Sequence, residues 1–450
     1  MTAQQDTWAI VGGGMLGLLL AHRLTQAGRR VTLIEAAPQL GGLASAWRLG
    51  DITWDRHYHV ILGTDTVLRG VLGELGLDSD IQWARTRTGF YVDERHYSMS
   101  NSWEFLTFPP LNLFDKVRLV ATILYASRVN AWQRLEGVLV EDWLRQWSGR
   151  RLTEKIWLPL LRAKLGDNYR KTSAAFIWAT IKRYYGARST GGAKTEMFGC
   201  VTGGYARIIE RFRAVLLAEG VEMQLGRAVR CVAPEAPGGL AVALADGTLQ
   251  RFDQVVLTVA SPVAARLCPG LAEEERQQHE KIDYMGIVCA SLLLRKPLRG
   301  FYVTNICDPT VPFTGVIEMS AVVNRAQFEG HTLVYLPKYV DAQDPALAWT
   351  DRDVEDRFLP AFLKMYPQLE PQDVLSFQVS REQYVMALPT LHYSEHLPPV
   401  STAVPGLHIV NSAHIINGTL NVNQTMQLAE REAARLLAQP QHVPLVEETL

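Results

Sequence analysis

Three glycines at positions 12, 14 and 17 constrain the fold of this chain more than any other feature. They follow an apolar run at residues 8–11 and begin a helical pattern that extends to Leu24. A second run rich in β-branched residues, at 31–34, ends on Glu35. Apolar runs of this length on either side of a glycine turn predict strand, turn, helix and strand. The N-terminal segment therefore predicts a parallel βαβ unit with a right-handed crossover.

The spacing GxGxxG has a physical basis in dinucleotide binding. Gly12 permits the tight turn, Gly14 lets the backbone approach a pyrophosphate, and Gly17 allows the helix to pack closely on the strand. The helix N-terminus, at Met15 and Leu16, offers N–H groups and a positive dipole end to phosphates. The carboxylate of Glu35 suits a ribose diol and disfavours the 2′-phosphate of NADP. The alternative interpretation is a structural turn of this type with nothing bound.

Composition excludes several classes of protein. The 450 residues are 48% apolar and 20% charged, which excludes a disordered chain and a disulfide-stapled scaffold. The net charge of −1 makes nucleic acid an unexpected partner. Scattered cysteines with no CxxC pair predict no metal site, and each is expected to be a small buried side chain in a reducing compartment. They are Cys200, Cys231, Cys268, Cys289 and Cys307.

The chain shows no targeting or membrane-spanning signal. The N-terminus lacks a basic region of the secretory type. No apolar stretch approaches the roughly 18–20 residues that a transmembrane helix needs. A cytoplasmic protein is therefore expected.

A glycine pair, Gly41 and Gly42, follows Glu35 by six and seven residues. GxGxxG, the glutamate and this pair together resemble the extended FAD-binding signature of the flavin amine oxidase superfamily. That group includes monoamine oxidases, protoporphyrinogen oxidases, phytoene desaturase-like enzymes and UDP-galactopyranose mutases. The resemblance implies that Ala36, Gly42 and Leu43 lie beside the FAD. Leu43 stands where the family often has Arg, so the contact of that Arg is not implied.

The C-terminal part carries the same resemblance. Residues 404–413 resemble the last strand of the superfamily, with Asn411 where Gly-Asp or Gly-Asn is usual. The resemblance implies that Asn421, Val422 and Met426, at the start of the last helix, face the N1/O2 edge of the flavin, where the helix dipole stabilises the reduced anion. The alternative is an Asn-capped surface helix. No cysteine lies in this region, so non-covalent FAD is expected.

The middle of the chain completes the predicted architecture. Residues 226–230 and 255–262 are similar to the family's adenine-side and "A-x-P" strands, which implies a backbone contact from Val229 to adenine. The predicted class is α/β, with a discontinuous Rossmann-type FAD-binding domain and an inserted α+β substrate domain that is partly helical. The FAD domain is expected at 6–62, 203–285 and 385–438, and the substrate domain at 63–202 and 286–384. Residues 64–199 are expected to be mostly helical, and β-like runs are expected at 287–294, 315–319 and 332–336.

One histidine is the candidate for catalysis. The resemblance places residues 54–61 beside the isoalloxazine ring, so His59, and less favourably His57, is a candidate proton donor or flavin contact. The alternative is a core histidine bonded to the backbone.

The helical region holds two further groups of residues. Its aromatic side chains are expected in the core rather than in a cofactor box: Trp103, Trp132, Trp143, Trp147, Trp157, Trp178, Phe105, Phe108 and Phe114. Its basic side chains are expected on a solvated helix face rather than in an anion site: Arg162, Lys164, Arg170, Lys171, Lys182 and Arg183. A peripheral contact of residues 105–111 and 117–125 with a bilayer is a second interpretation.

The resemblance implies an FAD-dependent oxidoreductase that removes hydride from, or desaturates, a small lipophilic molecule. Amine oxidation is disfavoured because residues 284–291 lack the lysine that amine-oxidising members usually carry. Only one dinucleotide fingerprint is present, so oxygen, a quinone or another carrier is the expected electron acceptor. Two alternatives stay open: a non-redox mutase acting on a nucleotide sugar, and a flavin-stabilised protein without turnover.

Overall fold

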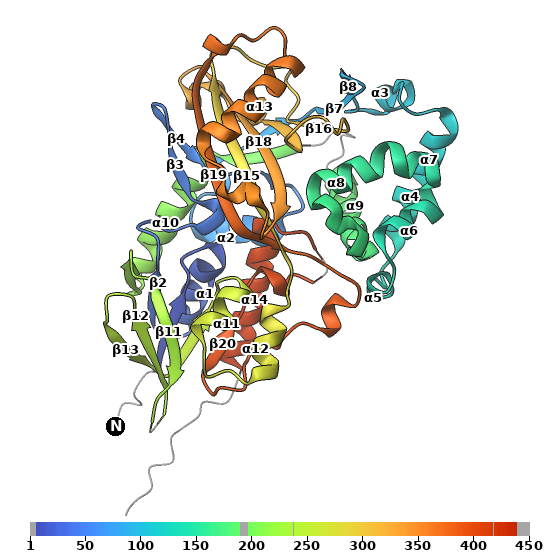
Figure 1. Cartoon of the computed structure of the whole chain (residues 1–450). Helices are drawn as coiled ribbons and strands as arrows, with labels where there is room; N and C mark the ends of the chain where they lie inside the picture. The colour runs from blue at the N-terminus through green and yellow to red at the C-terminus, as the bar shows by residue number, and fades with distance from the viewer. Residues whose placement is uncertain (1–5, 190–196, 237, 417, 439–450) are drawn as a thin grey trace, which may run out of the picture.

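A parallel sheet forms the lower part of the molecule (Figure 1). The computed structural model describes residues 6–189, 197–236, 238–416 and 418–438. The strand order is β10-β2-β1-β14-β20, and every neighbouring pair is parallel. The strands are β1 (Thr7–Val11), β2 (Arg30–Glu35), β10 (Glu222–Leu225), β14 (Gln254–Leu257) and β20 (Leu407–Ile409). Segments from the start, middle and end of the chain therefore build one sheet.

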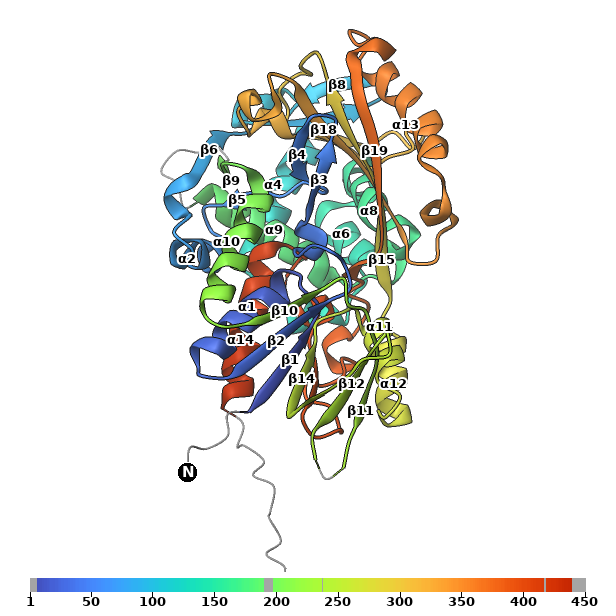
Figure 2. The ribbon, with the colours of Figure 1, turned by 90° about the vertical axis from the view of Figure 1, so that its left-hand side faces the viewer.

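Both faces of this sheet are covered (Figure 2). Trp8 and Ile10 pack under the helices α1 (Met15–Gln26), α10 (Gly204–Ala218) and α14 (Val422–Leu437). Ala9 and Val11 point to the other face, because successive side chains of a strand alternate. That face is covered by α11 (Ser261–Leu267) and a small antiparallel sheet of β11 (Val229–Pro234), β12 (Leu240–Leu244) and β13 (Leu249–Phe252). Helix α12 (Glu273–Glu280) follows α11.

A second sheet lies above the first, with the order β19-β15-β18-β17-β16-β7-β8. Strand β15 (Tyr284–Leu294), next to the edge strand β19, is buried along its whole length, and α13 (Asp351–Met365) packs on one face of the sheet. The runs predicted at 287–294 and 332–336 lie in strands of this sheet, and so does the run at 315–319 except for Met319, which begins a short 3-10 helix. The other strands are β7 (Thr88–Val92), β8 (Arg95–Ser98), β16 (Val303–Ile306), β17 (Gly315–Glu318), β18 (Thr332–Asp341) and β19 (Val374–Ala387).

A helical lobe lies to one side of the second sheet (Figure 1). Its helices are α3 (Ser102–Thr107), α4 (Leu113–Arg128), α5 (Gln133–Glu136), α6 (Val140–Ser148), α7 (Arg150–Leu152), α8 (Leu158–Leu165) and α9 (Ala174–Ser189). The smaller elements outside this lobe are β3 (Ala46–Leu49), β4 (Ile52–Asp55), β5 (Ile61–Leu62) and α2 (Thr66–Glu74).

Residues 64–199 are mostly helical, as predicted, but the prediction missed the strands within this segment. This segment also contributes β6 (Ile81–Arg85), β7, β8 and the start of β9 (Met197–Val201). The hairpin between β7 and β8 turns at Asp93 and Glu94, whose φ angles of 50° and 58° are positive. Such a turn usually contains glycine or asparagine, so the sequence carried no signal for it.

The expectation of a core role also fails for two aromatic side chains. Trp143, Trp157 and Trp178 are buried, but Trp103 is 73% exposed and Phe114 is 65% exposed. Both lie on helices whose outer surface is not covered by any described part of the chain.

All five cysteines have free thiols, and three of them are buried and two are half-buried. Among the described residues no cluster of His, Cys, Asp or Glu could hold a metal. No helix in the described ranges has both the length and the apolar character to cross a bilayer.

Candidate functional site

The carboxyl ends of four parallel strands meet at one edge of the lower sheet. Gly12 follows β1, Glu35 ends β2, Thr258 follows β14 and Asn411 lies two residues beyond β20. Backbone hydrogen bonds between these strand ends keep them in register. Open α/β sheets bind their ligands outside this edge. The fold therefore brings together four segments that the sequence singled out separately.

The turn after β1 accepts only glycine. Gly12 has a φ of +113°, and a Cβ there would collide with Oγ1 of Thr258. A Cβ on Gly17 would collide with the carbonyl oxygen of Gly12. Thr258 fixes the turn by donating from Oγ1 to Val11 O at 3.0 Å and to Gly12 O at 3.2 Å. Sequence reasoning did not single out Thr258, although its position directly after β14 was a usable signal.

Helix α1 presents an open N-terminus to this edge. Gly14 is its N-cap; among the described residues no side chain caps it, and its first turn holds no acid. The first backbone N–H groups of a helix have no acceptor within the helix, so those at Met15, Leu16 and Gly17 are available to an anion. Gly42 lies against this turn, because an added Cβ on Gly42 would be 3.3 Å from Gly14 Cα.

Glu35 is held by backbone N–H groups on both sides of it. Oε2 accepts from Gly13 N at 2.5 Å and Oε1 accepts from Ala37 N at 2.8 Å. The carbonyl oxygen of Glu35 accepts from Arg227 N at 2.9 Å, which brings the start of β11, with half-buried Val229, to the same edge. The carboxylate is thus positioned beside the glycine turn, and Ala36 next to it is exposed.

Asn411 uses its side chain within the protein. It is 2% exposed, donates from Nδ2 to Val259 O at 2.9 Å and accepts at Oδ1 from Ala413 N at 3.0 Å. Its amide therefore fixes the turn after β20.

Leu43, half-buried, lies in the short helical turn that begins at Gly42.

The start of α14 is capped and hydrogen-bonded to the first turn of α2. Asn421 Oδ1 accepts from Gln424 N at 3.0 Å, and Asn423 Oδ1 accepts from Leu68 N at 3.0 Å. Val422, the first residue of the helix, is half-buried, whereas Met426 is fully buried in the core under α1. The contacts of these residues with a cofactor stay predictions.

The two histidines after β4 have different surroundings. His57 Nε2 lies 3.2 Å from Ser380 Oγ, whereas the ring of His59 lies 4.9 Å from that of Tyr205. Burial lowers the pKa of His57 to about 3 and that of His59 to about 4. Both are therefore neutral at pH 7, so His59 can exchange hydrogen bonds there but is not a cationic acid. Its catalytic role stays a prediction.

Asp55, at the end of β4, supports the helix beside His59. Its Oδ1 accepts from Tyr205 N at 2.8 Å, at the start of α10. Burial raises the pKa of Asp55 to about 8, against the lowering effect of hydrogen bonds from the backbone of Tyr205 and Ala206. The carboxyl group is thus mostly protonated at neutral pH.

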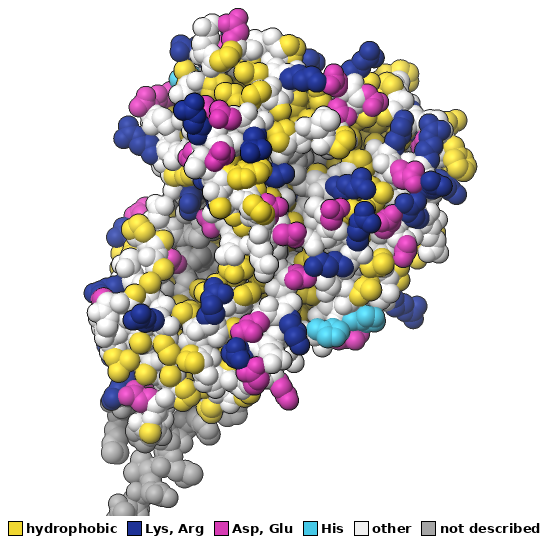
Figure 3. All heavy atoms as spheres, viewed as in Figure 1, with side chains coloured by type: hydrophobic (Ala, Val, Ile, Leu, Met, Phe, Trp, Pro, Cys, Tyr) yellow, Lys and Arg dark blue, Asp and Glu magenta, His cyan; other side chains and the backbone are white. Residues whose placement is uncertain are grey.

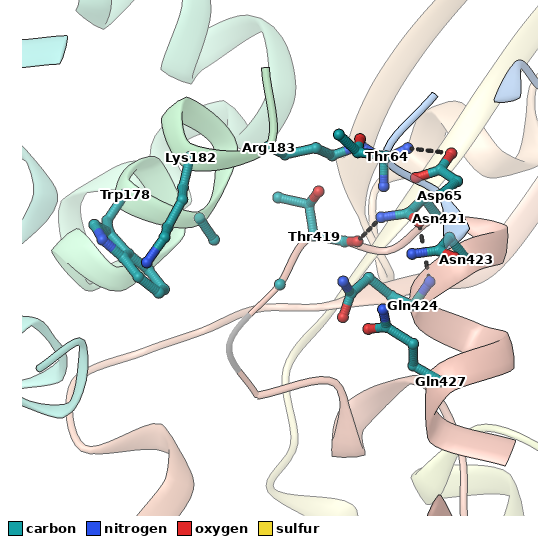
Figure 4. Close-up of a pocket in the computed structure, with 12 residues that line it drawn as sticks. Thr64, Asp65, Trp178, Lys182, Arg183, Thr419, Asn421, Asn423, Gln424 and Gln427 are labelled. Atoms are coloured by element: carbon teal, nitrogen blue, oxygen red, sulfur yellow. Dashed lines mark hydrogen bonds and ion pairs between the residues drawn. The ribbon is translucent and has the colours of Figure 1, made fainter. Parts of the chain in front are cut away.

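A pocket of ≈ 230 Å³ lies between α9 and the start of α14 (Figure 4). Lys182 and Arg183 extend from α9 toward it. Arg183 Nη2 lies 3.4 Å from Asp65 Oδ2, and Lys182 Nζ lies 5.0 Å from the centre of the Trp178 ring. Burial raises the pKa of Asp65, and Arg183 opposes that rise. The opposite wall is polar and consists of Thr419, Asn421, Asn423, Gln424 and Gln427.

The basic residues of the helical lobe therefore divide into two groups. The side chain of Arg170 is 67% exposed, as expected for a solvated helix face. Lys182 and Arg183 instead line the pocket, which the preferred interpretation did not predict.

The face of β15 toward His57 carries no lysine. Val288 pairs with Lys338 of β18, and both lie on the side covered by α13. Tyr339 points to the opposite side, where its hydroxyl lies 2.8 Å from that of Tyr58. Lys164 of α8 lies 3.6 Å above the Tyr339 ring.

The residues at this edge fit FAD, the cofactor that the resemblance implies. Three glycines in a row, Gly12 to Gly14, leave the backbone without side chains beside the N-terminus of α1, which no side chain of the described residues caps. Nδ1 of His59 and the hydroxyl of Tyr205 are buried without a hydrogen-bond partner in the described part of the chain. Buried polar atoms of this kind usually have a partner, which a bound ligand can supply.

Comparison with known proteins gives one family match and two sequence relatives of note. The model of the family "Flavin containing amine oxidoreductase" matches residues 16–437. A 15-cis-phytoene desaturase from Capsicum annuum is 26% identical over 196 residues, which cover 39% of this chain and 33% of the desaturase. A carotenoid phi-ring synthase from Streptomyces griseus is 28% identical over 290 residues, covering 59% of this chain and 54% of the synthase. The chain thus aligns with only a third to a half of these relatives.

Solved structures share the fold over nearly the whole chain. A candidate protoporphyrinogen oxidase from Exiguobacterium sp. 255-15 has a TM-score of 0.76 at 18% identity, with 97% of this chain and 100% of that chain covered. A reduced UDP-galactopyranose mutase has a TM-score of 0.72 at 16% identity, with coverages of 96% and 94%. Likenesses at this level of identity concern the fold alone.

Proposed function

The chain belongs to the flavin-containing amine oxidoreductase family and is an FAD-dependent oxidoreductase, and from that premise we propose that it desaturates, or removes hydride from, a lipophilic isoprenoid-type molecule. When bound, FAD accepts the electrons that leave the substrate. Residues of this chain bind and orient the substrate and exclude water from it.

The proposed cofactor site is the carboxyl edge of the parallel sheet, within a discontinuous Rossmann-type domain that carries an inserted substrate domain. The open N-terminus of α1 holds the pyrophosphate, and Glu35 holds the adenosine ribose. Val229 supplies a backbone contact to adenine. The start of α14, at Asn421, directs its positive dipole end at the flavin ring. The orientation of Glu35 by Gly13 N and Ala37 N supports this assignment.

The pocket between α9 and α14 is polar and charged apart from Trp178 and Ala179, so in this proposal only its Trp178 side contacts the lipophilic substrate. The Arg183–Asp65 pair closes one side. Neutral His59 acts as a hydrogen-bond partner near the ring and does not carry a positive charge at pH 7. Oxygen, a quinone or another carrier removes the electrons afterwards.

One observation carries the choice of substrate: the face of β15 that points toward His57 has no lysine, and amine oxidation would need one there. The names of the two sequence relatives, a phytoene desaturase and a carotenoid ring synthase, support the same choice. The mutase shares the fold alone, so the nucleotide-sugar alternative has less support.

An anaerobic flavin-bleaching screen tests the proposal. The purified holoprotein is mixed with isoprenoid polyenes, porphyrinogens, amines and nucleotide sugars, and the flavin absorbance is followed. We expect an isoprenoid to bleach the flavin and amines to leave it oxidised. Bleaching by amines alone, or conversion of a nucleotide sugar only after dithionite reduction, would overturn the proposal.

A further inference from the structure

The pocket between α9 and α14 carries an excess of positive charge. Two cations line it, Lys182 and Arg183, and among its described lining residues Asp65 is the one acid. Asp65 is 3% exposed, and burial raises the pKa of its carboxyl group. This carboxyl group therefore offsets at most one of the two positive charges. A pocket lined by an excess of one charge attracts ligands of the opposite charge.

Lys182 has a hydrogen-bond donor to spare. Its Nζ donates to Val129 O at 3.4 Å and to Asn130 Oδ1 at 3.2 Å, and both acceptors are neutral. The described residues give Nζ these two acceptors and the face of the Trp178 ring, but no carboxylate. Because an ammonium group has three N–H donors, the third is available to a ligand.

Cations on the outer surface of the helical lobe have acidic neighbours. Arg145 lies 2.7 Å from Glu141, and Arg150 lies 2.9 Å from Glu154. Figure 3 shows dark blue and magenta side chains next to one another over the lobe that carries these helices in Figure 1. Lys182 has no such acidic neighbour among the described residues, so it differs from the solvated helix face that the sequence predicted.

The size of the pocket and its apolar side describe the rest of the ligand. The volume of ≈ 230 Å³ is below the roughly 300–1,000 Å³ of sites that enclose a whole drug-sized molecule. The pocket therefore fits one end of a longer molecule. Trp178 and Ala179 form an apolar wall one helical turn from Lys182 and Arg183. A ligand with an anionic end beside an apolar chain matches this arrangement.

We propose that the substrate is an isoprenoid that ends in a phosphate or diphosphate group, and that Lys182 and Arg183 bind this group while the chain lies on the Trp178 side. The ammonium group attracts phosphate oxygens as a point charge, and the guanidinium fork matches two of them. A phosphate monoester carries about 1.5–2 negative charges at pH 7, which suits two cations better than a single carboxylate does. The isoprenoid part rests on the proposed function, whereas the anion site does not.

Calorimetric titration of the FAD-saturated protein with inorganic pyrophosphate tests the anion site without turnover, and the bound FAD keeps the probe out of the cofactor site. The wild type is compared with Lys182→Gln and Lys182→Arg. Lys155→Gln is the matched control, because Lys155 Nζ also donates to a backbone carbonyl, Pro110 O at 2.9 Å, outside the pocket. We expect K182Q to bind pyrophosphate at least about tenfold more weakly, and K182R and K155Q to bind it within about threefold of the wild type. An unchanged flavin spectrum of K182Q shows that this variant is folded and holds its cofactor.

The anaerobic flavin-bleaching assay then tests the prenyl part. A prenyl diphosphate is compared with the prenyl alcohol of the same length, and a nucleotide sugar, which carries the same diphosphate, is added as a competitor. We expect the prenyl diphosphate to reach half-maximal bleaching at a concentration at least about tenfold lower than the alcohol. K182Q should raise this concentration for the diphosphate and leave the limiting rate of bleaching unchanged, because the anionic end lies away from the reacting bond.

Failure of the wild type to bind pyrophosphate, or equal losses in K182Q and K155Q, would overturn the anion site. A shifted flavin spectrum in K182Q with unchanged pyrophosphate binding would also overturn it, because the flavin would then be the partner of Lys182.

Equal bleaching by the alcohol and the diphosphate would overturn the phosphate-ended substrate and leave the proposed function intact. Tighter binding of the nucleotide sugar than of the prenyl diphosphate would overturn the prenyl assignment. Pyrophosphate binding that depends on Lys182, without bleaching by any isoprenoid, would contradict the proposed function and leave the anion site in place.

Discussion

Gly17 and Gly70 are both helix glycines, but only Gly17 lies where a side chain cannot fit. A Cβ on Gly17 would collide with Gly12 O, whereas a Cβ on Gly70 of α2 would meet nothing within 4 Å. Gly17→Ala should therefore move α1 away from the turn, destabilise the fold by about 1–3 kcal/mol and weaken FAD binding. Gly70→Ala should keep FAD binding and stabilise the helix by up to about 1 kcal/mol.

Urea unfolding and FAD titration of both variants check this pair. Unchanged FAD affinity in G17A would contradict the proposed binding of FAD at the glycine turn. Equal losses in G17A and G70A would show that helix glycines in general, and not this contact, set the stability.

The buried ring of His59 predicts a pH dependence. Its pKa is about 4 in the folded protein and about 6.5 in the unfolded chain, so the unfolded state binds the additional proton between these values. The stability that His59 contributes is present above about pH 6.5 and is lost as the pH falls toward 4. The melting temperature of the wild type should fall more steeply than that of His59→Gln from pH 7 to pH 5, with FAD saturating. Parallel slopes would contradict the buried, neutral state of His59.

Some of these residues could be predicted from the sequence and others could not. Gly12, Gly14, Gly17 and Glu35 were predictable because a local pattern of spacing defines them. Thr258 was missed because its contact with Gly12 joins residues 246 positions apart and forms only when β14 pairs with β1.

The N-terminus of α14 can be tested as an element. Asn421→Ala removes the acceptor for Gln424 N and should cost about 1 kcal/mol. Thr350→Ala is the matched control, because Thr350 caps α13 in the same way, accepting from Asp353 N at 3.1 Å. Both variants should lose similar stability in chemical denaturation. Only N421A should shift the flavin spectrum or its reduction potential; equal spectra would contradict the role proposed for α14.

Elements were predictable where an apolar pattern was strong and local. Helix α1 and strands β1, β2 and β15 follow from such patterns. The β7–β8 hairpin was missed because its turn residues, Asp93 and Glu94, adopt positive φ without the glycine that usually signals it. The exposure of α4 was missed because an apolar helical pattern predicts a core helix when the neighbouring elements are not known.

At the scale of the whole molecule, the sequence indicated that distant segments of the chain build one sheet. Residues from β1, β14 and β20 share one sheet, and their motifs lie near the start, middle and end of the chain. The pocket was not predictable in this way. Its walls come from α9 and from residues 418–427, which are far apart in sequence and carry no shared motif.

A single-turnover experiment under anaerobic conditions tests the central claim most directly. The FAD-loaded protein receives an isoprenoid that bleaches its flavin, and the reduced flavin and the product are both quantified. The account predicts one new carbon–carbon double bond, or one hydride removed, for each flavin reduced. Product formed without net reduction of the flavin would contradict it.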